Sequence, residues 1–348
     1  MKFSVIIPLY NKAPYVRKAL ESVFAQTYTD YELIVIDDGS TDDSAEIAEE
    51  VLQEATPHRP IASSPYRLLK QANAGVSAAR NNGVAASCGD YVAILDADDW
   101  WDPTYLERMA QLIKDYPDAG LYACNYIYYK PGKTHVALNI PTGHINYPKA
   151  YYESNAMPVW TGAAMIPRKV FDEMGGFPLG IKLGEDFLLW SKIALKYPIA
   201  FLNEPLAWYN NDVPAMLRAT RNLHAPEHHM LFHLDECKVE SVKCKGKEDG
   251  KAEITTSHRL IAQSPYCPTN DDWRRLIDTL RIFGLMDYWL DKRYHDLAAD
   301  ELRKIDWSKQ PASVRRIYKT PVWLLKLKRS AMRVGSCVKQ RIISFINL

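Results

Sequence analysis

The chain has 348 residues, 47% of them hydrophobic and 24% charged, which is the composition of a soluble globular protein large enough for one large domain or two ordinary ones. The formal net charge is only +1, but it is unevenly distributed. No acidic residue follows Asp306, so the residues after it carry a charge of +10 and the rest of the chain carries −9. The ten basic residues after Asp306 are Lys309, Arg315, Arg316, Lys319, Lys326, Lys328, Arg329, Arg333, Lys339 and Arg341. The six cysteines are scattered, which argues against a disulfide scaffold, and the lack of a signal peptide argues against secretion. The chain has no run of about 18 apolar residues, so no transmembrane helix is expected. Together these features favour a cytoplasmic protein.

The predicted elements alternate between strand and helix from the N-terminus. Apolar, β-rich runs predict strands at 3–7, 32–36, 66–69 and 92–95, and helical spacing of apolar residues predicts helices near 14–24, 43–54 and 103–116. Residues 71–81 are expected to form a loop that enters an Ala-rich helix. Further strands are expected at 119–129, 160–166 and 199–209, a helix from Glu185, and irregular structure at 130–157. This order predicts a mostly parallel, doubly wound sheet flanked by helices.

The composition changes after the last predicted strand. We expect a catalytic domain at 1–214, a mainly helical extension at 215–310 and a basic amphipathic tail at 311–348. In the tail, the apolar residues recur at helical spacing and lie off the basic positions: Val334, Val338, Ile342 and Phe345.

The strand at 92–95 ends in a cluster of carboxylates, Asp96, Asp98 and Asp99. Open α/β sheets bind their ligands at the carboxyl ends of their strands. Clustered carboxylates repel one another unless a cation lies between them, and such hard oxygen ligands suit Mg²⁺ or Mn²⁺ carrying a diphosphate. The alternative is a solvated acidic turn that precedes the next helix.

Five short motifs, in order, resemble those of glycosyltransferase family 2: VIIPLYN (5–11), IDDGSTD (36–42), NAG (73–75) with ARN (79–81), LDADD (95–99) and GED (184–186) with Trp190. Each motif alone is weak, but the whole set at this spacing is specific, and it covers about residues 1–210. The resemblance implies the GT-A fold, a Rossmann-like sheet flanked by helices, and an inverting transfer of a sugar.

The resemblance implies that nine residues contact the donor nucleotide: Pro8, Leu9, Tyr10, Asn11, Asp38, Gly75, Arg80, Asp96 and Ala97. Asp38 resembles the carboxylate that accepts the uracil N–H, although capping of its own turn is an alternative. Arg80 resembles the cation near the nucleotide, and a salt bridge to Asp38 or Asp96 is the alternative.

The same resemblance implies that Asp98 binds the metal directly and that Asp186 is the general base, with Glu185 orienting the acceptor. The alternative is that both carboxylates of the last motif only stabilise a helix N-terminus. Many relatives have a metal-binding His after the last strand. This chain has none there, and Asp212 or Asn211 could take its place. Asp99 is a further candidate for a metal or donor-sugar contact, with capping of the next turn as the alternative.

The sequence therefore predicts an inverting, Mn²⁺- or Mg²⁺-dependent glycosyltransferase. It would move a sugar from a nucleoside diphosphate sugar, preferably a UDP-sugar, to a hydroxyl of a glycan or lipid-linked acceptor in surface polysaccharide biosynthesis. The basic tail predicts contact with the anionic inner face of the cell membrane, and no nucleic-acid partner is expected. The rival predictions are a non-catalytic nucleotide-sugar-binding scaffold and a nucleotidyltransferase.

One further segment is rich in possible zinc ligands: His224, His228, His229, His233 and Cys237. It lacks the Cys pair, at the spacing of a structural zinc site, that would favour zinc binding.

Overall fold

The computed structural model describes residues 1–55, 65–154, 156–214, 223–237, 266, 268–322 and 325. The chain divides into two compact units, Met1–Trp273 and Arg274–Leu348. The expected domain boundaries after residues 214 and 310 stay predictions, because most of 215–267 lies outside the described residues.

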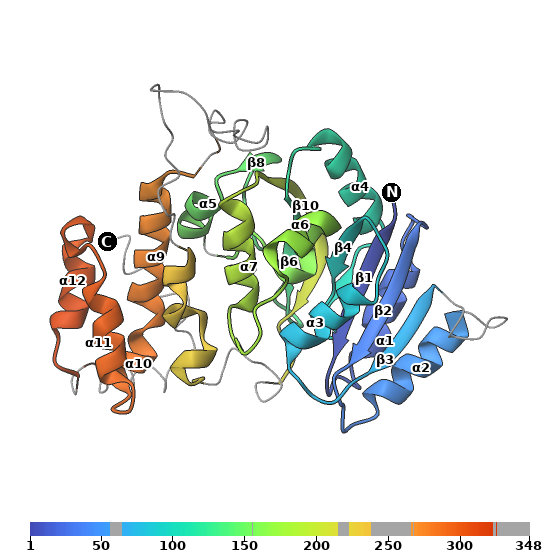
Figure 1. Ribbon diagram of the computed structural model, residues 1–348, viewed down its shortest axis with the longest axis horizontal. Helices are drawn as coiled ribbons and strands as arrows, with labels where there is room; N and C mark the ends of the chain where they lie inside the picture. Colours follow the sequence, from blue (N-terminus) through green and yellow to red (C-terminus); the bar gives the residue numbers. More distant parts are fainter. Residues whose placement is uncertain are drawn as a thin grey trace. The chain divides into compact units, whose positions relative to one another are not determined.

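The first unit is built on one sheet with strand order β3-β2-β1-β4-β9-β6-β10-β5 (Figure 1). The strands on this path are β1 (Phe3–Leu9), β2 (Tyr31–Asp37), β3 (Tyr66–Lys70), β4 (Tyr91–Ile94), β5 (Trp100–Trp101), β6 (Leu121–Tyr129), β9 (Ala164–Pro167) and β10 (Ile199–Asn210). Strands β3, β2, β1 and β4 are parallel, and so are β6 and β10, whereas β9 runs antiparallel to β4 and β6. The predicted mostly parallel sheet is confirmed.

Helices connect and flank these strands (Figure 1): α1 (Val16–Phe24), α2 (Ser44–Ala55), α3 (Val76–Ala85), α4 (Tyr105–Asp115), α5 (Tyr147–Glu153), α6 (Arg168–Met174) and α7 (Glu185–Ala194). Helix α1 shows why they form: Val16, Ala19, Leu20 and Val23 recur at helical spacing and are fully buried. Burying each of the larger side chains stabilises the fold by about 1.5–3 kcal/mol.

The parallel register brings three loops to one edge of the sheet. Leu9 lies beside Asp37, and Ile6 lies beside Ile94, so β1, β2 and β4 end at the same edge. The loops that follow these strands contain the first, second and fourth motifs. The GT-A-like sheet therefore brings the predicted donor residues together.

One prediction for the middle of the chain was wrong, and a second was right only in part. The segment 130–157, expected to be irregular, contains β7 (His135–Val136), β8 (Gly143–Ile145) and α5. The strand expected at 160–166 begins as a 3₁₀ turn, Thr161–Ala163, and only then continues as β9. Both β7 and β8 are short: β8 pairs with β10, which is distant in sequence, and β7 forms two residue pairs with the preceding strand β6, so local periodicity gave no signal for either.

The rest of the described chain is helical. Three 3₁₀ turns, Pro226–His228, Met230–Phe232 and Leu234–Cys237, precede α9 (Asn270–Gly284), α10 (Met286–Leu290), α11 (His295–Arg303), the turn η8 (Trp307–Lys309) and α12 (Ala312–Lys319). The predicted apolar stripe of the tail, from Val334 to Phe345, lies outside the described residues. Within the described ranges, no helix combines the length and apolar character needed to cross a bilayer.

Candidate active site

The loops after β1 and β2 hold each other in place. Asn11 adopts a left-handed backbone conformation (φ 51°), and its side-chain Oδ1 accepts a hydrogen bond from the Thr41 N–H at 2.8 Å. The Asn11 N–H in turn donates to Ser40 Oγ at 3.1 Å. Tyr10, one residue earlier, is 46% exposed. These bonds fix the turn that leaves the Tyr10 ring accessible, as a surface for a flat nucleobase would require.

Asp38 anchors the loop that enters α3. It is buried, and its carboxylate accepts hydrogen bonds from the backbone N–H groups of Ala74 (2.8 Å) and Gly75 (2.9 Å) and from Gln71 Nε2 (2.7 Å). Gly75 has φ 89°, a conformation that favours glycine. Each carboxylate oxygen has two lone pairs. The Asp38 oxygen bonded to Gly75 therefore retains capacity for a further donor, and the contact with a base stays a prediction.

One buried guanidinium joins two of the predicted motifs. Arg80 is 4% exposed; its Nη2 donates to Asp96 Oδ1 at 2.9 Å, and its Nη1 donates to Glu185 Oε1 at 2.7 Å. Burial alone would lower the pKa of Arg80, but the carboxylates of Asp96 and Glu185 raise it. The guanidinium also lies 5.0 Å from the centre of the Phe177 ring. The Asp96 salt bridge was the alternative left open by the sequence; the Glu185 bond was not foreseen.

Asp98, the predicted metal ligand, is paired with a lysine. Lys12 Nζ lies 2.6 Å from Asp98 Oδ2, and both side chains are 17% exposed. Lys12 follows directly on the turn after β1, at the same edge of the sheet as Asp98. An ammonium group therefore supplies positive charge at the place where the sequence predicts a cation.

The third carboxyl of the cluster, Asp99, is 2% exposed. Burial raises the pKa of Asp99 well above the ordinary range, and the charges of Asp98 and Asp96 raise it further. The backbone N–H of Asn210 donates to Asp99 Oδ1 at 2.7 Å, and this hydrogen bond lowers the pKa. The bond to Asn210 ties the end of β10 to the acidic loop. Asp99 thus has a structural partner of its own.

This donor set fits a divalent cation chemically. Asp96, Asp98 and Asp99 gather carboxylate oxygens at one loop, and carboxylate oxygens are the ligands that Mg²⁺ and Mn²⁺ prefer. Among the described residues, however, no three His, Cys, Asp or Glu side chains are already grouped as a metal site. Asp212 is exposed in the turn after β10, where its N–H donates to Asn210 Oδ1 at 3.0 Å.

The two acidic residues at the start of α7 have different surroundings. Glu185 is 8% exposed and bound to Arg80; burial raises its pKa, Asp186 adds to this, and Arg80 opposes it. Asp186 is half-buried, and its carboxylate accepts hydrogen bonds from Thr161 Oγ1 at 2.8 Å and from the N–H of Phe187 at 2.7 Å. Asp186 is therefore oriented by neutral donors and partly accessible, as a proton acceptor must be.

An aromatic group lies on the Asp186 side of the site. The Trp160 ring lies 5.1 Å from the rings of both Tyr126 and Tyr209. Burial raises the pKa of Tyr151, and the charge of Asp186 raises it further, which identifies Tyr151 as a near neighbour of Asp186. Trp160 and Tyr126 are buried, so these two rings pack in the core, and only Tyr209 is partly exposed.

Sequence reasoning missed three residues that complete the site: Lys12, Thr161 and Asn210. Lys12 could have been noticed as a cation immediately after the first motif. Thr161 and Asn210 gave no signal, because each acts through one hydrogen bond to a residue distant in sequence.

The histidines after β10 serve local hydrogen bonds. The ring of His228 bonds to Gly180 O (2.7 Å), and that of His233 bonds to Glu227 O (3.1 Å). His229 Nδ1 accepts from the Leu231 N–H at 3.2 Å, and burial lowers the pKa of His229 to about 4. These contacts give the described histidines structural partners near the end of the first unit.

Comparisons with known proteins agree with this geometry. Residues 4–175 match the sequence profile described as Glycosyl transferase family 2. The chain is 33% identical over 224 residues to glycosyltransferase GlyA of Streptococcus pneumoniae and 43% identical over 145 residues to the uncharacterized glycosyltransferase YibD of Escherichia coli. These matches cover 60% and 41% of this chain, but only 30% and 39% of those relatives.

The fold has solved counterparts as well. TarS of S. aureus, residues 1–349, crystallised in complex with UDP-GlcNAc, superposes with a TM-score of 0.60 at 17% identity, covering 87% of this chain and 90% of that one. At this identity the likeness establishes the GT-A-like fold alone. The ordered motifs, the sheet that brings them to one edge and the matched profile lead to one conclusion: through residues 4–175, this chain belongs to glycosyltransferase family 2.

Proposed function

We propose that the chain is an inverting glycosyltransferase that moves a sugar from a UDP-sugar to a hydroxyl group with the help of Mn²⁺ or Mg²⁺. The observation that carries the proposal is the Arg80 bridge. This one guanidinium joins Asp96, in the predicted donor loop, to Glu185, the neighbour of the predicted base Asp186. We propose that this bridge keeps the donor and acceptor residues within reach of one sugar. The TarS complex with UDP-GlcNAc supports the choice of a UDP-sugar.

Different residues are proposed to bind the nucleoside and the cation. The turn at Tyr10 and the loop held by Asp38 would bind the nucleoside. A divalent cation held by Asp98, when bound, supplies Lewis-acid stabilisation of the departing diphosphate. We propose Asp99 or Asp212 as a further metal or donor-sugar contact.

Inversion follows from a single displacement. The acceptor oxygen forms a bond to the anomeric carbon as the bond to the diphosphate oxygen breaks, and Asp186 takes the hydroxyl proton. Asp186 is suited to this, because Thr161 and the Phe187 N–H orient its carboxylate without neutralising it. Glu185 is already bound to Arg80 and is therefore less suited to take the proton, so we propose that it orients the acceptor.

The proposal is tested by the release of UDP from a panel of UDP-sugars in the presence of Mn²⁺. Release that depends on the metal and on Asp98 supports it. Turnover of GDP- or CMP-sugars instead would reassign the donor, and the absence of turnover with every nucleotide sugar would remove the enzymatic function.

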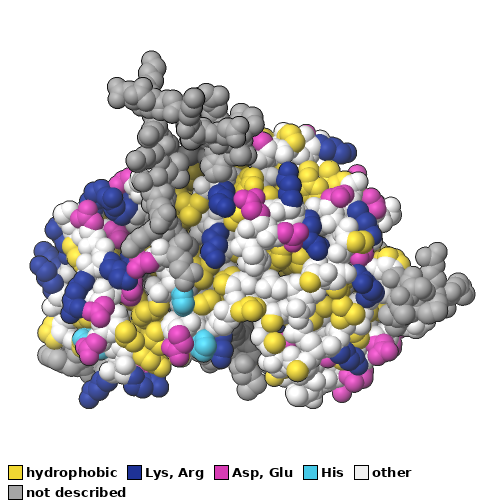
Figure 2. All heavy atoms as spheres, in the orientation of Figure 1, with side chains coloured by type: hydrophobic (Ala, Val, Ile, Leu, Met, Phe, Trp, Pro, Cys, Tyr) yellow, Lys and Arg dark blue, Asp and Glu magenta, His cyan; other side chains and the backbone are white. Residues whose placement is uncertain are grey.

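We further propose that the acceptor is a glycan or a lipid-linked glycan of surface polysaccharide biosynthesis, used at the cytoplasmic face of the cell membrane. On the face shown in Figure 2, side chains of both charges are interspersed over the described surface. The strongest candidate for contact with anionic lipid is therefore the acid-free stretch that continues beyond the described residues.

Deleting residues 326–348 removes six of the ten basic residues and leaves α12 intact. We expect this truncation to lose most co-sedimentation with vesicles of anionic lipid, and raised salt to weaken binding of the full chain, because ions screen the attraction. Equal binding to neutral vesicles, or full binding by the truncated chain, would contradict the membrane proposal.

A further inference from the structure

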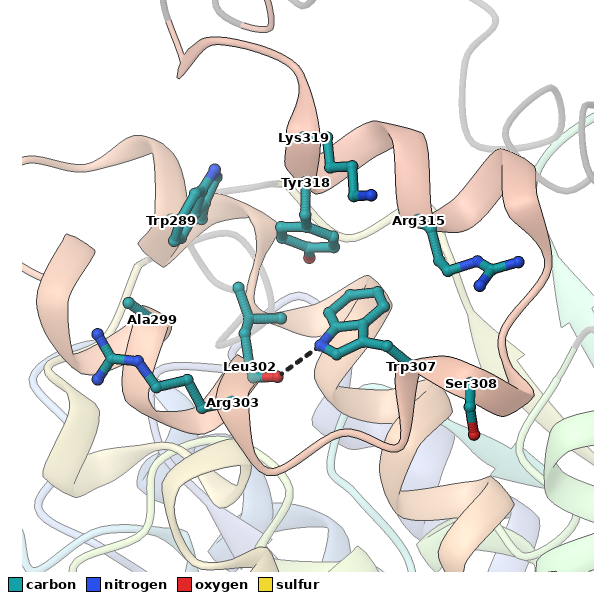
Figure 3. A pocket seen from close by; sticks show the side chains of 9 residues that line it. All are labelled: Trp289, Ala299, Leu302, Arg303, Trp307, Ser308, Arg315, Tyr318 and Lys319. Atoms are coloured by element: carbon teal, nitrogen blue, oxygen red, sulfur yellow. Dashed lines mark hydrogen bonds between the residues drawn. The ribbon is translucent and has the colours of Figure 1, made fainter.

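The second compact unit contains a cavity that none of the candidate active-site residues lines. Its volume is about 610 Å³, and it is lined by residues of α10, α11, η8 and α12 (Figure 3). This volume lies within the roughly 300–1,000 Å³ typical of small-molecule sites. Every lining residue belongs to the second unit, so the cavity can be considered by itself.

Three aromatic side chains form much of the wall: Trp289, Trp307 and Tyr318 (Figure 3). The Tyr318 ring lies 5.8 Å from the Trp289 ring and 5.7 Å from the Trp307 ring, tilted by 74° and 61°. The Trp307 N–H donates to Leu302 O at 3.0 Å, and the Tyr318 hydroxyl donates to Ile282 O at 2.5 Å. These bonds hold the Trp307 and Tyr318 rings by their polar atoms, whereas the buried Trp289 Nε1 has no hydrogen-bond partner among the described residues, and the apolar ring surface remains for a ligand.

The remaining wall is cationic. Arg315 and Lys319 lie one turn apart on α12, both exposed, and Arg303 of α11 also lines the cavity. Arg303 pairs with Asp300, but Arg315 and Lys319 have no salt bridge within the described part of the chain. No acidic residue lines the cavity. Its charge therefore attracts an anion, and a guanidinium can bind a phosphate or carboxylate through two hydrogen bonds.

The ligand must satisfy both kinds of wall. The C–H face of a sugar ring carries partial positive charge and suits the negative face of an aromatic ring. A phosphate or carboxylate on that sugar suits Arg315 and Lys319. A hydrocarbon chain would leave the cations without a partner, whereas inorganic phosphate would leave the rings unused. We infer that this cavity binds an anionic saccharide, a glycan unit that carries a phosphate or carboxylate.

This inference rests on the proposed function. A nucleotide also combines a ring with a phosphate and could satisfy the same walls, and it is the proposed glycan acceptor that favours a saccharide. The cavity would then hold a charged part of the acceptor in the second unit. Glycosyl transfer and cavity binding can fail independently, since the first is measured by UDP release and the second by direct saccharide binding.

The test is calorimetric titration of the full chain with trigalacturonic acid and with glucose 1-phosphate, beside cellotriose, inorganic phosphate and UDP. At least one of the two anionic saccharides should bind at least tenfold more tightly than cellotriose and inorganic phosphate. In the double variant Arg315→Gln/Lys319→Gln that affinity should fall at least tenfold. Both side chains are exposed, so the variant should fold normally.

The matched control is Lys292→Gln/Arg316→Gln, which removes the same charge from exposed positions of the second unit outside the cavity. Its affinity should change less than twofold. Failure of both anionic saccharides to bind would overturn the inference. An equal loss of saccharide affinity in the two double variants would also overturn it. The same holds if UDP or anionic vesicles, and not the saccharides, bind in a way that depends on Arg315 and Lys319.

Discussion

Replacing Asp186 with asparagine is expected to lower kcat for sugar transfer by about 10²–10⁴-fold, the usual contribution of a general base. The amide keeps the size of the side chain and can still accept the hydrogen bond from Thr161 Oγ1, but it cannot take the acceptor proton. The affinity for the donor nucleotide should stay nearly unchanged, because the proposed nucleotide contacts lie on the loops after β1, β2 and β4. Transfer rates and UDP affinity, measured on the same preparation, separate the two effects.

The informative companion is Glu185→Gln. Glu185 is buried against Arg80, so this variant should lose stability through the weakened ion pair, while the base itself remains in place. If Glu185→Gln keeps its fold but loses transfer, and Asp186→Asn turns over at the normal rate, the two roles are reversed and the assignment of Asp186 is wrong.

Replacing Arg80 with alanine should destabilise the first unit by about 3–5 kcal/mol, the typical cost of removing one partner of a buried ion pair. Asp96 would lose its partner, and Glu185 would stay buried without one. Urea denaturation of the wild type and the variant measures the loss. Arg17→Ala is the control: Arg17 pairs with three carboxylates, those of Glu21, Glu50 and Glu54, but at the surface, and its removal should shift the midpoint far less.

The pH dependence of the Arg80→Ala variant has a definite sign. Burial and Asp186 already raise the pKa of Glu185 in the wild type, and Arg80 opposes that shift. Without Arg80, the folded-state pKa of Glu185 should rise further above its unfolded value of about 4.3. The variant should therefore be closest to the wild type below that value and lose relative stability as the pH rises through the folded pKa. A deficit that does not change with pH would exclude Glu185 as its source.

The fold and the donor loops could be predicted because their signals are local. Apolar runs that end in carboxylates locate the strand ends, and parallel pairing brings the ends of β1, β2 and β4 to one edge. The position of Asp96 and Asp98 just after the strand at 92–95 was predicted in this way. Short edge strands such as β5 were missed, because Trp100 and Trp101 are ordered by pairing with β10 and not by any local pattern.

Side-chain partners could not be predicted because they depend on tertiary packing. Arg80 and Glu185 are 105 positions apart, and Lys12 and Asp98 are 86 positions apart. The sequence identified Arg80 as an important cation, but only the folded chain shows that one side chain serves two carboxylates. The cavity of the second unit is a similar case, since Trp289 and Tyr318 belong to different helices and meet only in the fold.

The most direct test of the proposed chemistry is UDP release from UDP-sugars by the wild type and by Asp98→Ala, each assayed with Mn²⁺ and with excess EDTA. The account predicts release by the wild type with Mn²⁺ only, and loss of this metal-dependent release in Asp98→Ala although its fold, followed by circular dichroism, is retained. Equal release with EDTA, or undiminished Mn²⁺-dependent release by Asp98→Ala, would contradict the assignment of Asp98 as the residue that holds the catalytic cation.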